Sequence, residues 1–254
     1  MLDITIIKCL SDNYSYLIRD KKTNTVAVVD PSEMDPIDFE IQKSYKKLDF
    51  ILNTHHHYDH VGGNKKLKEK YNCKVVGFEK DKSRIPEIDI TLKDNQKWEN
   101  DLFECSILHI PGHTSGHICI YISEINALFT GDTLFSLGCG RIFEGTYKEM
   151  YESLNKIKKF PPDTKIYCGH EYTKKNSDFC LSIDKKNSKL INKISEINNN
   201  IKNGNPTIPS ILGDELECNI FLRSDNTEIQ KQLGINIGNP IEAFAKLRDL
   251  KDNF

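Results

Sequence analysis

The sequence predicts an α/β domain followed by a smaller helical domain. Over the first two thirds of its 254 residues, short β-branched and aromatic runs alternate with polar turns and few helical patterns. Two runs, TVAVVD and FILNTH, are apolar on both faces, which is typical of interior strands covered on both sides. After Tyr172 no strong strand run follows. We therefore predict a sheet-based domain over residues 1–172 and a helical domain over residues 173–254.

The runs that we interpret as strands share alternating or continuous apolar positions between turn residues. They are DITIIK, YSYLIRD, TVAVVD, FILNTHH, KVVGF, FECSILHI, HICIYIS, ALFTGD and KIYCGH. Helical spacing predicts a helix over 189–202, with its apolar face at Leu190, Ile191, Ile194, Ile197 and Ile201. A last helix is predicted in NPIEAFAKLRDLKDNF, where Asn239 can cap and Pro240 fits the first position. Its apolar face would comprise Ile241, Phe244, Leu247 and Leu250.

Composition excludes several classes of protein. The net charge is −2 and basic residues are interspersed with acidic ones, so no nucleic-acid partner is expected. No apolar run approaches the roughly 18 residues of a membrane span, and the N-terminal stretch lacks the pattern of a signal peptide. We therefore expect a cytoplasmic protein with no membrane partner, as a monomer or, alternatively, a dimer.

The cysteines point to neither disulfides nor a thiolate metal site. They are spread along the chain without a C-x-x-C pair, and most lie within apolar segments. We predict that all eight are buried free thiols. They are Cys9, Cys73, Cys105, Cys119, Cys139, Cys168, Cys180 and Cys218.

Histidines gather in three short blocks, THHHYDH, HIPGHTSGH and CGHEY. In an extended segment, residues two apart point the same way, so His55 and His57 can reach one ion while His56 points elsewhere. Asp59 and His60 follow at the turn into a helix and can face a second ion. Further donors lie at the ends of other predicted strands. They are His113, Asp132 and His170.

Five histidines and two carboxylates suit divalent metals such as zinc, iron or manganese. Two adjacent ions need a ligand that bridges them, and the two oxygens of Asp132 can do so. The pattern thus predicts hydrolysis by a water activated between two cations. The alternative for a histidine at a strand end is a structural role, which we assign to His56, His109 and His117. Of these, His117 can orient a ligand, and Asp132 taken alone is an ordinary turn residue.

Together, THHHYDH, PGHTSGH, GDTLF and CGHEY resemble the metallo-β-lactamase superfamily, whose fold is an αββα sandwich. More narrowly, LGCGRIFEGT, GHEYT and KLRDLKDNF are similar to the glyoxalase II (hydroxyacylglutathione hydrolase) family over nearly the whole chain. The resemblance implies two metal ions, with zinc expected. It assigns His55, His57 and His113 to the first ion, Asp59, His60 and His170 to the second, and Asp132 to both.

The same resemblance implies a glutathione site. It assigns the glutathione moiety to Arg141, Phe143, Tyr172, Arg248 and Lys251. Guanidinium and ammonium groups suit the carboxylates of glutathione, and we expect Arg248 and Lys251 on the polar side of the last helix. Phe143 stands where some relatives carry tyrosine, Arg141 where others carry lysine, and NIFLR replaces the usual N-P-F-L-R. The alternative for the basic pair is a solvated helix end.

The resemblance implies hydrolysis of the thioester S-D-lactoylglutathione to D-lactate and glutathione by a metal-bridging hydroxide. Asp132 would hold the two ions and Asp59 would orient the hydroxide. A lactonase and a glutathione persulfide dioxygenase are the alternatives within the superfamily. A nucleic-acid-processing enzyme and a non-catalytic relative are less consistent with the charge and with the intact ligands.

Overall fold

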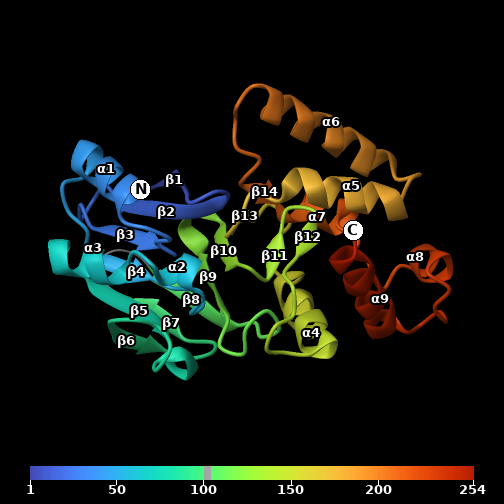
Figure 1. The fold of residues 1–254 in the computed structure, drawn as a ribbon, viewed down its shortest axis with the longest axis horizontal. Coiled ribbons are helices and arrows are strands. Elements are labelled where there is room, and N and C mark those ends of the chain that lie inside the picture. Colours follow the sequence, from blue (N-terminus) through green and yellow to red (C-terminus); the bar gives the residue numbers. More distant parts are fainter. Residues whose placement is uncertain (100–103) are drawn as a thin grey trace. The chain divides into compact units, whose positions relative to one another are not determined.

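The N-terminal hydrophobic runs form a mixed sheet whose strands lie side by side in chain order (Figure 1). Strands β1 to β3 pair antiparallel, whereas β3 to β6 pair parallel. The strands are β1 (Leu2–Cys9), β2 (Asn13–Asp20), β3 (Val26–Val29), β4 (Phe50–Leu52), β5 (Lys74–Phe78) and β6 (Ile88–Leu92). The prediction that TVAVVD and FILNTH form interior strands is confirmed, because β3 and β4 each have a strand on both sides.

Helices cover one face of this sheet (Figure 1). The helices of this region are α1 (Asp35–Ser44), α2 (Tyr58–Val61) and α3 (Asn64–Tyr71), and the turn η1 (Glu79–Asp81) follows β5. Ile37 and Ile41 of α1 and Leu67 of α3 are fully buried, in one cluster with the strand residues Val28 and Val75. This apolar layer fixes the sheet, and with it the segments that leave the strand ends.

A second, antiparallel group of strands packs on the other face. Its strands are β7 (Lys97–Glu99), β8 (Glu104–His109), β9 (Ile118–Ile122) and β10 (Ala127–Gly131), with the turn η2 (Ser123–Ile125) before β10. Tyr16 of β2 contacts Phe129 of β10 with 5.4 Å between ring centroids, and Phe50 of β4 meets Trp98 of β7 at the same separation. The two sheets thus form the inner layers of a sandwich.

The computed structural model describes residues 1–99 and 104–254. Phe103, the first residue of the predicted strand FECSILHI, lies outside the described residues. Contacts divide the chain into two compact units. The N-terminal unit is Met1–His109 with Gly116–Gly131, and the C-terminal unit is Ile110–Ser115 with Asp132–Phe254. The domain boundary at residue 172 stays a prediction.

The C-terminal unit is mainly helical. Its strands are β11 (Leu134–Phe135) and β12 (Gly138–Cys139), which form a hairpin, and β13 (Lys165–Cys168) and β14 (Ser210–Ile211), which pair antiparallel. Its helices are α4 (Tyr147–Ile157), α5 (Thr173–Ile183), α6 (Ser188–Lys202), α7 (Leu212–Cys218), α8 (Thr227–Gln232) and α9 (Pro240–Asp252). In the described chain, no helix combines the length and apolar character that crossing a membrane requires.

The two helices predicted after residue 172 are present as α6 and α9, with Pro240 in the first turn of α9. Their faces differ in part from the prediction. In α6 only Leu190 and Ile197 of the predicted stripe are buried. In α9 Ile241 and Leu250 are more than a third exposed. The residues buried in α9 are Ala243, Phe244, Leu247 and Arg248. The Asn239 side chain makes no capping bond to the helix backbone.

The prediction for the cysteines is confirmed. All eight are free and buried. Burial raises the pKa of Cys139 to about 11 and that of Cys168 to about 12. Neutral thiols of this kind are weak nucleophiles, so the cysteines serve as small apolar core residues.

Candidate metal centre

The histidine-rich segment leaves the end of β4 and enters α2. His55 is fully buried, and its ring lies 4.8 Å from that of His57 and 4.1 Å from that of His60, between centroids. His56 lies on the other side of the extended segment, with its Nδ1 3.3 Å from an Asp81 carboxylate oxygen. Strand-like alternation thus brings His55 and His57 to the same side, and the turn into α2 places His60 beside them.

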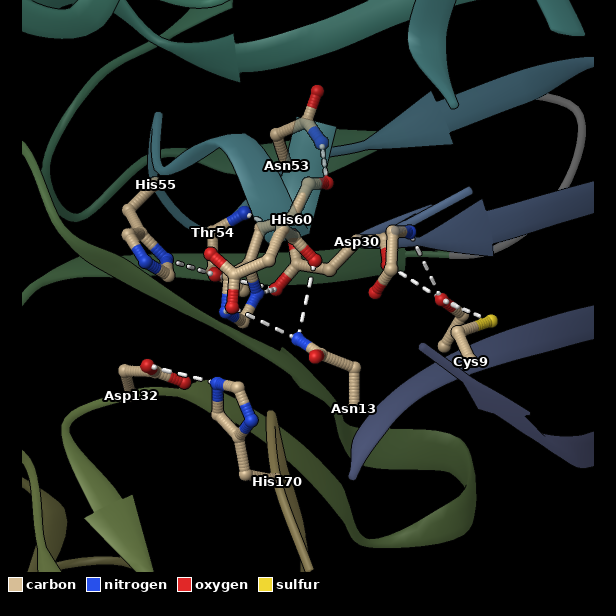
Figure 2. Close-up of polar contacts among 12 residues, drawn as sticks. Cys9, Asn13, Asp30, Asn53, Thr54, His55, His60, Asp132 and His170 are labelled. Carbon is tan, nitrogen blue, oxygen red and sulfur yellow. Dashed lines mark hydrogen bonds and ion pairs between the residues drawn. The ribbon is translucent and has the colours of Figure 1, made fainter. Parts of the chain in front are cut away.

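A buried aspartate at the end of β3 holds this segment. Asp30 accepts hydrogen bonds from Thr54 N at 2.8 Å and from Thr54 Oγ1 at 2.6 Å (Figure 2). Its Oδ2 also lies 3.0 Å from His60 Nδ1. A carboxylate can only accept, so His60 carries its proton on Nδ1 and offers the lone pair of Nε2 to a metal. Asp30 is therefore an orienting residue.

Thr54 orients His55 in the same way. The Thr54 hydroxyl gives its single proton to Asp30, so its contact with His55 Nδ1, at 3.0 Å, requires His55 to be the donor. His55 Nε2 then keeps a lone pair. Asp30, His55 and His60 each offer a ligand atom within 4.8 Å of the others, but the carboxylate of Asp30 is already engaged by Thr54 and His60.

Two asparagines position the rest of this segment. Asn13 of β2 donates through Nδ2 to Asp59 Oδ2 at 3.0 Å and to the Asp59 carbonyl at 3.2 Å. Asn53 donates to the His60 carbonyl at 3.0 Å. Asp59 Oδ2 lies 3.7 Å from His60 Nε2, so two donor atoms suited to one cation face each other. The N-terminal unit thus presents four of the predicted metal ligands.

His117 and His109 each stack on a neighbouring ring, and their structural role stays a prediction. The buried His117 ring stacks on that of His55 at 4.6 Å, and His109 stacks on Phe78 at 4.7 Å. Gly131 is required beside His117, because a Cβ there would lie 2.7 Å from the ring and 2.4 Å from Thr54 Oγ1. Its φ of +47° also favours glycine.

The other three predicted ligands converge within the C-terminal unit. His113 Nε2 and His170 Nε2 lie 3.4 and 3.3 Å from the same oxygen, Oδ2 of Asp132 (Figure 2 shows the second pair). All three side chains are nearly buried. His113 Nδ1 lies 2.8 Å from the Arg141 carbonyl, which can only accept, so the His113 proton is on Nδ1. Its Nε2 lone pair therefore faces a carboxylate oxygen, an arrangement that a shared cation stabilises.

The predicted glutathione-binding residues also lie in the C-terminal unit. The Tyr172 ring stacks on that of His170 at 4.7 Å, and the exposed Phe143 ring meets His113 edge to face at 5.2 Å. The Arg141 side chain is exposed. Arg248, however, is only 3% exposed, so the expectation that it lies on the polar side of the last helix is wrong.

Arg248 is buried because it bonds a distant backbone segment. Its Nη1 donates to the Cys139 carbonyl at 2.7 Å, and its guanidinium lies 5.2 Å above the Phe221 ring. Lys251 lies against the rings of Phe179 and Phe254, with its Nζ 5.2 Å from each centroid. Burial and the nearby Arg248 lower the pKa of Lys251 to about 8.

Sequence reasoning missed the residues that orient the ligands, above all Asp30, Thr54 and Asn13. Asp30 directly follows the buried run TVAVV, which is the same strand-end signal that marked Asp132. That signal could have identified Asp30. Nothing local distinguishes Asn13, whose partner lies 46 residues away.

Comparisons with known proteins agree with this fold and these donors. Residues 11–170 match the family model described as metallo-beta-lactamase superfamily, and residues 171–254 match that of the hydroxyacylglutathione hydrolase C-terminus. Two solved structures share the fold over most of this chain. They are ETHE1 from Myxococcus xanthus (TM-score 0.67, 21% identity, 99% of each chain) and the BLEG-1 B3 metallo-beta-lactamase (TM-score 0.66, 19% identity, 87% of this chain and 99% of that one). Fold and donors thus define an enzyme of the metallo-β-lactamase superfamily, whose histidine and aspartate groups are metal-binding groups.

Curated relatives identify the family to which the chain belongs within this superfamily. The chain is 56% identical over 253 residues to the hydroxyacylglutathione hydrolase of Pelagibacter ubique (strain HTCC1062), covering 100% of both chains. It is 44% identical to that of Rhodospirillum rubrum, covering 100% of this chain and 99% of the relative. The chain belongs to the hydroxyacylglutathione hydrolase family, the glyoxalase II enzymes.

Proposed function

We propose that this hydroxyacylglutathione hydrolase acts on S-D-lactoylglutathione, yielding D-lactate and glutathione. The observation that carries the proposal is the full-length identity of 56% to a curated hydroxyacylglutathione hydrolase, which includes the matched C-terminal region. The donor groups described above are consistent with the metal-dependent hydrolysis that this chemistry requires.

We propose that the two sets of donors together bind two divalent ions. Zinc is expected, with iron or manganese as alternatives, because nitrogen and oxygen donors suit all three. The first ion would be held by His55, His57 and His113, the second by Asp59, His60 and His170, and both by Asp132. The Nδ1–H forms of His55, His60 and His113 support this proposal, since each leaves Nε2 available for a metal. Bound divalent cations lower the pKa of a water molecule and polarise the thioester carbonyl.

The protein residues contribute orientation and proton handling. Asp59, whose Oδ2 accepts a hydrogen bond from Asn13, would orient the attacking water and take up its proton. The water oxygen forms a bond to the acyl carbon, and the carbon–sulfur bond breaks. The sulfur leaves as a thiolate, so the carboxylate product and the thiolate together leave two protons from the water. Because a thiol has a pKa of about 8.5, the released glutathione thiolate takes up one of them near neutral pH. The reaction therefore releases one net proton near neutral pH.

Binding of the glutathione moiety is assigned to side chains of the C-terminal unit. Arg141, Arg248 and Lys251 would attract its carboxylates, while Phe143 and Tyr172 would contact its apolar parts. Phe143 has no hydroxyl, so any contact there is apolar. A monomeric state and a cytoplasmic location remain predictions, and size-exclusion chromatography with light scattering tests the first.

The test follows the ultraviolet absorbance of the thioester of S-D-lactoylglutathione with metal-loaded protein. We expect rapid hydrolysis by the wild type and by Asp35→Ala, a control that removes an exposed carboxylate from the first turn of α1. Asp132→Ala should lose both bound metal and activity. Absence of turnover by the metal-loaded wild type would reject the substrate, and lactones and glutathione persulfide would be assayed next.

A further inference from the structure

One carboxylate oxygen at the end of α9 lies between two guanidinium groups. Asp252 Oδ1 is 2.8 Å from Arg248 Nη2 and 3.5 Å from Arg141 Nε. The Asp252 side chain is 38% exposed and that of Arg141 is 63% exposed, whereas that of Arg248 is only 4% exposed. Asp252 is therefore the solvent-facing counter-ion of a buried arginine.

Arg248 has little freedom to move toward a ligand. Its Nη1 is bonded to the Cys139 carbonyl, its Nη2 to Asp252, and its plane lies over the Phe221 ring. Its Nε is buried and makes no hydrogen bond within the described chain. A ligand carboxylate can thus pair with Arg248 mainly at the position that the carboxylate of Asp252 holds.

Arg141 is held differently. Its Nε lies 3.5 Å from Asp252 and its side chain is 63% exposed, so a second carboxylate can reach its guanidinium from solvent. The guanidinium of Arg141 is therefore accessible to a ligand, whereas the charge of Arg248 is already neutralised by Asp252. Asp249, on the same helix, accepts a hydrogen bond from the Tyr147 hydroxyl and, within the described residues, forms no hydrogen bond or ion pair with either arginine.

We propose that Asp252 is a specificity-determining residue that competes with a carboxylate of glutathione for Arg141 and Arg248. This inference rests on the proposed function, because it assumes that these arginines bind the glutathione moiety. An internal carboxylate keeps the buried guanidinium compensated in the free protein and weakens binding of the ligand. Weaker binding of glutathione favours release of the product, which limits the turnover of many enzymes.

The test compares Asp252→Asn with Asp249→Asn in the metal-loaded, full-length protein. Both variants remove one negative charge from α9, but only the first removes it from the arginines. We measure the dissociation constant of glutathione by calorimetry, its inhibition constant in the hydrolysis assay, and the KM for S-D-lactoylglutathione. A charge about 5 Å from the ligand in a solvated site gives an expected tightening of about three- to tenfold for Asp252→Asn, with a steeper dependence on salt. Asp249→Asn should differ from the wild type by less than about twofold.

Unchanged or weaker glutathione binding by Asp252→Asn would overturn the proposal, since Asp252 would then only orient the arginines. Equal tightening by Asp249→Asn would overturn it too, because the effect would reflect net charge alone. Thermal unfolding checks that the variants are folded, and Asp252→Ser serves as a second neutral variant with the same expected tightening. A wild type that neither hydrolyses the thioester nor binds glutathione would instead reject the proposed function.

Discussion

Replacing Asp30 by alanine should weaken metal binding although Asp30 is not among the proposed ligands. The buried carboxylate accepts hydrogen bonds from Thr54 N, Thr54 Oγ1 and His60 Nδ1. Without it, His60 loses the acceptor that keeps its proton on Nδ1, and the Thr54 hydroxyl is free to donate to His55. Both imidazoles can then present a protonated Nε2 to the metal.

The expected losses of metal affinity and of stability can be worked out from the hydrogen bonds that the substitution removes. Loss of an orienting carboxylate typically lowers metal affinity 10- to 100-fold, or about 1.4–2.7 kcal/mol. The three hydrogen bonds to the buried carboxylate are also lost, and each contributes about 1 kcal/mol to the stability of the fold. Asp30 also has a φ of +47°, which alanine tolerates less well, by about 1 kcal/mol. We therefore expect a loss of about 4 kcal/mol in the free energy of unfolding.

Competition with a chromophoric chelator measures the zinc affinity, and urea unfolding of the metal-free protein measures stability. Asp30→Asn is the matched control. Its carbonyl oxygen can face both Thr54 Oγ1 and His60 Nδ1, so only the bond from Thr54 N is lost and both effects should be smaller. Wild-type zinc affinity in a folded Asp30→Ala protein would refute the assignment of Asp30 as an orienting residue.

Three further outcomes are expected. Burial beside Arg248 lowers the pKa of Lys251 to about 8, so its charge is lost as the pH rises through that value, and the KM for the glutathione thioester should rise above pH 8. If the KM of Lys251→Arg rose equally steeply with pH, loss of the Lys251 charge would be excluded as the cause. Burial raises the pKa of Glu215, which accepts a bond from Leu137 N. The folded state thus disfavours ionisation, so stability falls as the pH rises above the usual value of 4.5, and urea unfolding should show a flatter pH profile for Glu215→Gln. An unchanged profile would contradict this account. Thr146→Ala removes the capping box of α4 and should lower stability by about 1 kcal/mol in thermal unfolding, whereas no shift would show that the cap is dispensable.

The sheet and the ligand-bearing segments could be predicted because their signals are local. Apolar runs of strand length specify β3 and β4, and a polar residue directly after such a run is carried to the strand end. Histidine is rare enough that four in seven residues indicate shared chemistry. Aspartate after a strand is common in turns, so the strand-end position of Asp30 did not by itself distinguish it from an ordinary turn residue.

The surroundings of Arg248 could not be predicted, because the partner that buries it is distant in sequence. Periodicity placed Phe244 and Leu247 correctly inside, but it cannot distinguish which neighbouring positions complete the face. The Cys139 carbonyl, 109 residues away, accepts from Arg248 and so favours its burial over that of Leu250. A buried arginine with a backbone acceptor and a carboxylate is stable where an unpaired one would not be.

The hydrogen bonds to the imidazoles fix their orientation and the position of their protons before a metal binds. His60 is held by the carboxylate of Asp30, His55 by the Thr54 hydroxyl, and His113 by the Arg141 carbonyl. Three different acceptors thus impose the same Nδ1–H form, which lowers the reorganisation that metal binding requires. Arg141 takes part with its backbone, whereas its side chain faces Asp252. Because any residue at position 141 supplies the carbonyl, its side chain can change with the demands of substrate binding while the orientation of His113 is preserved.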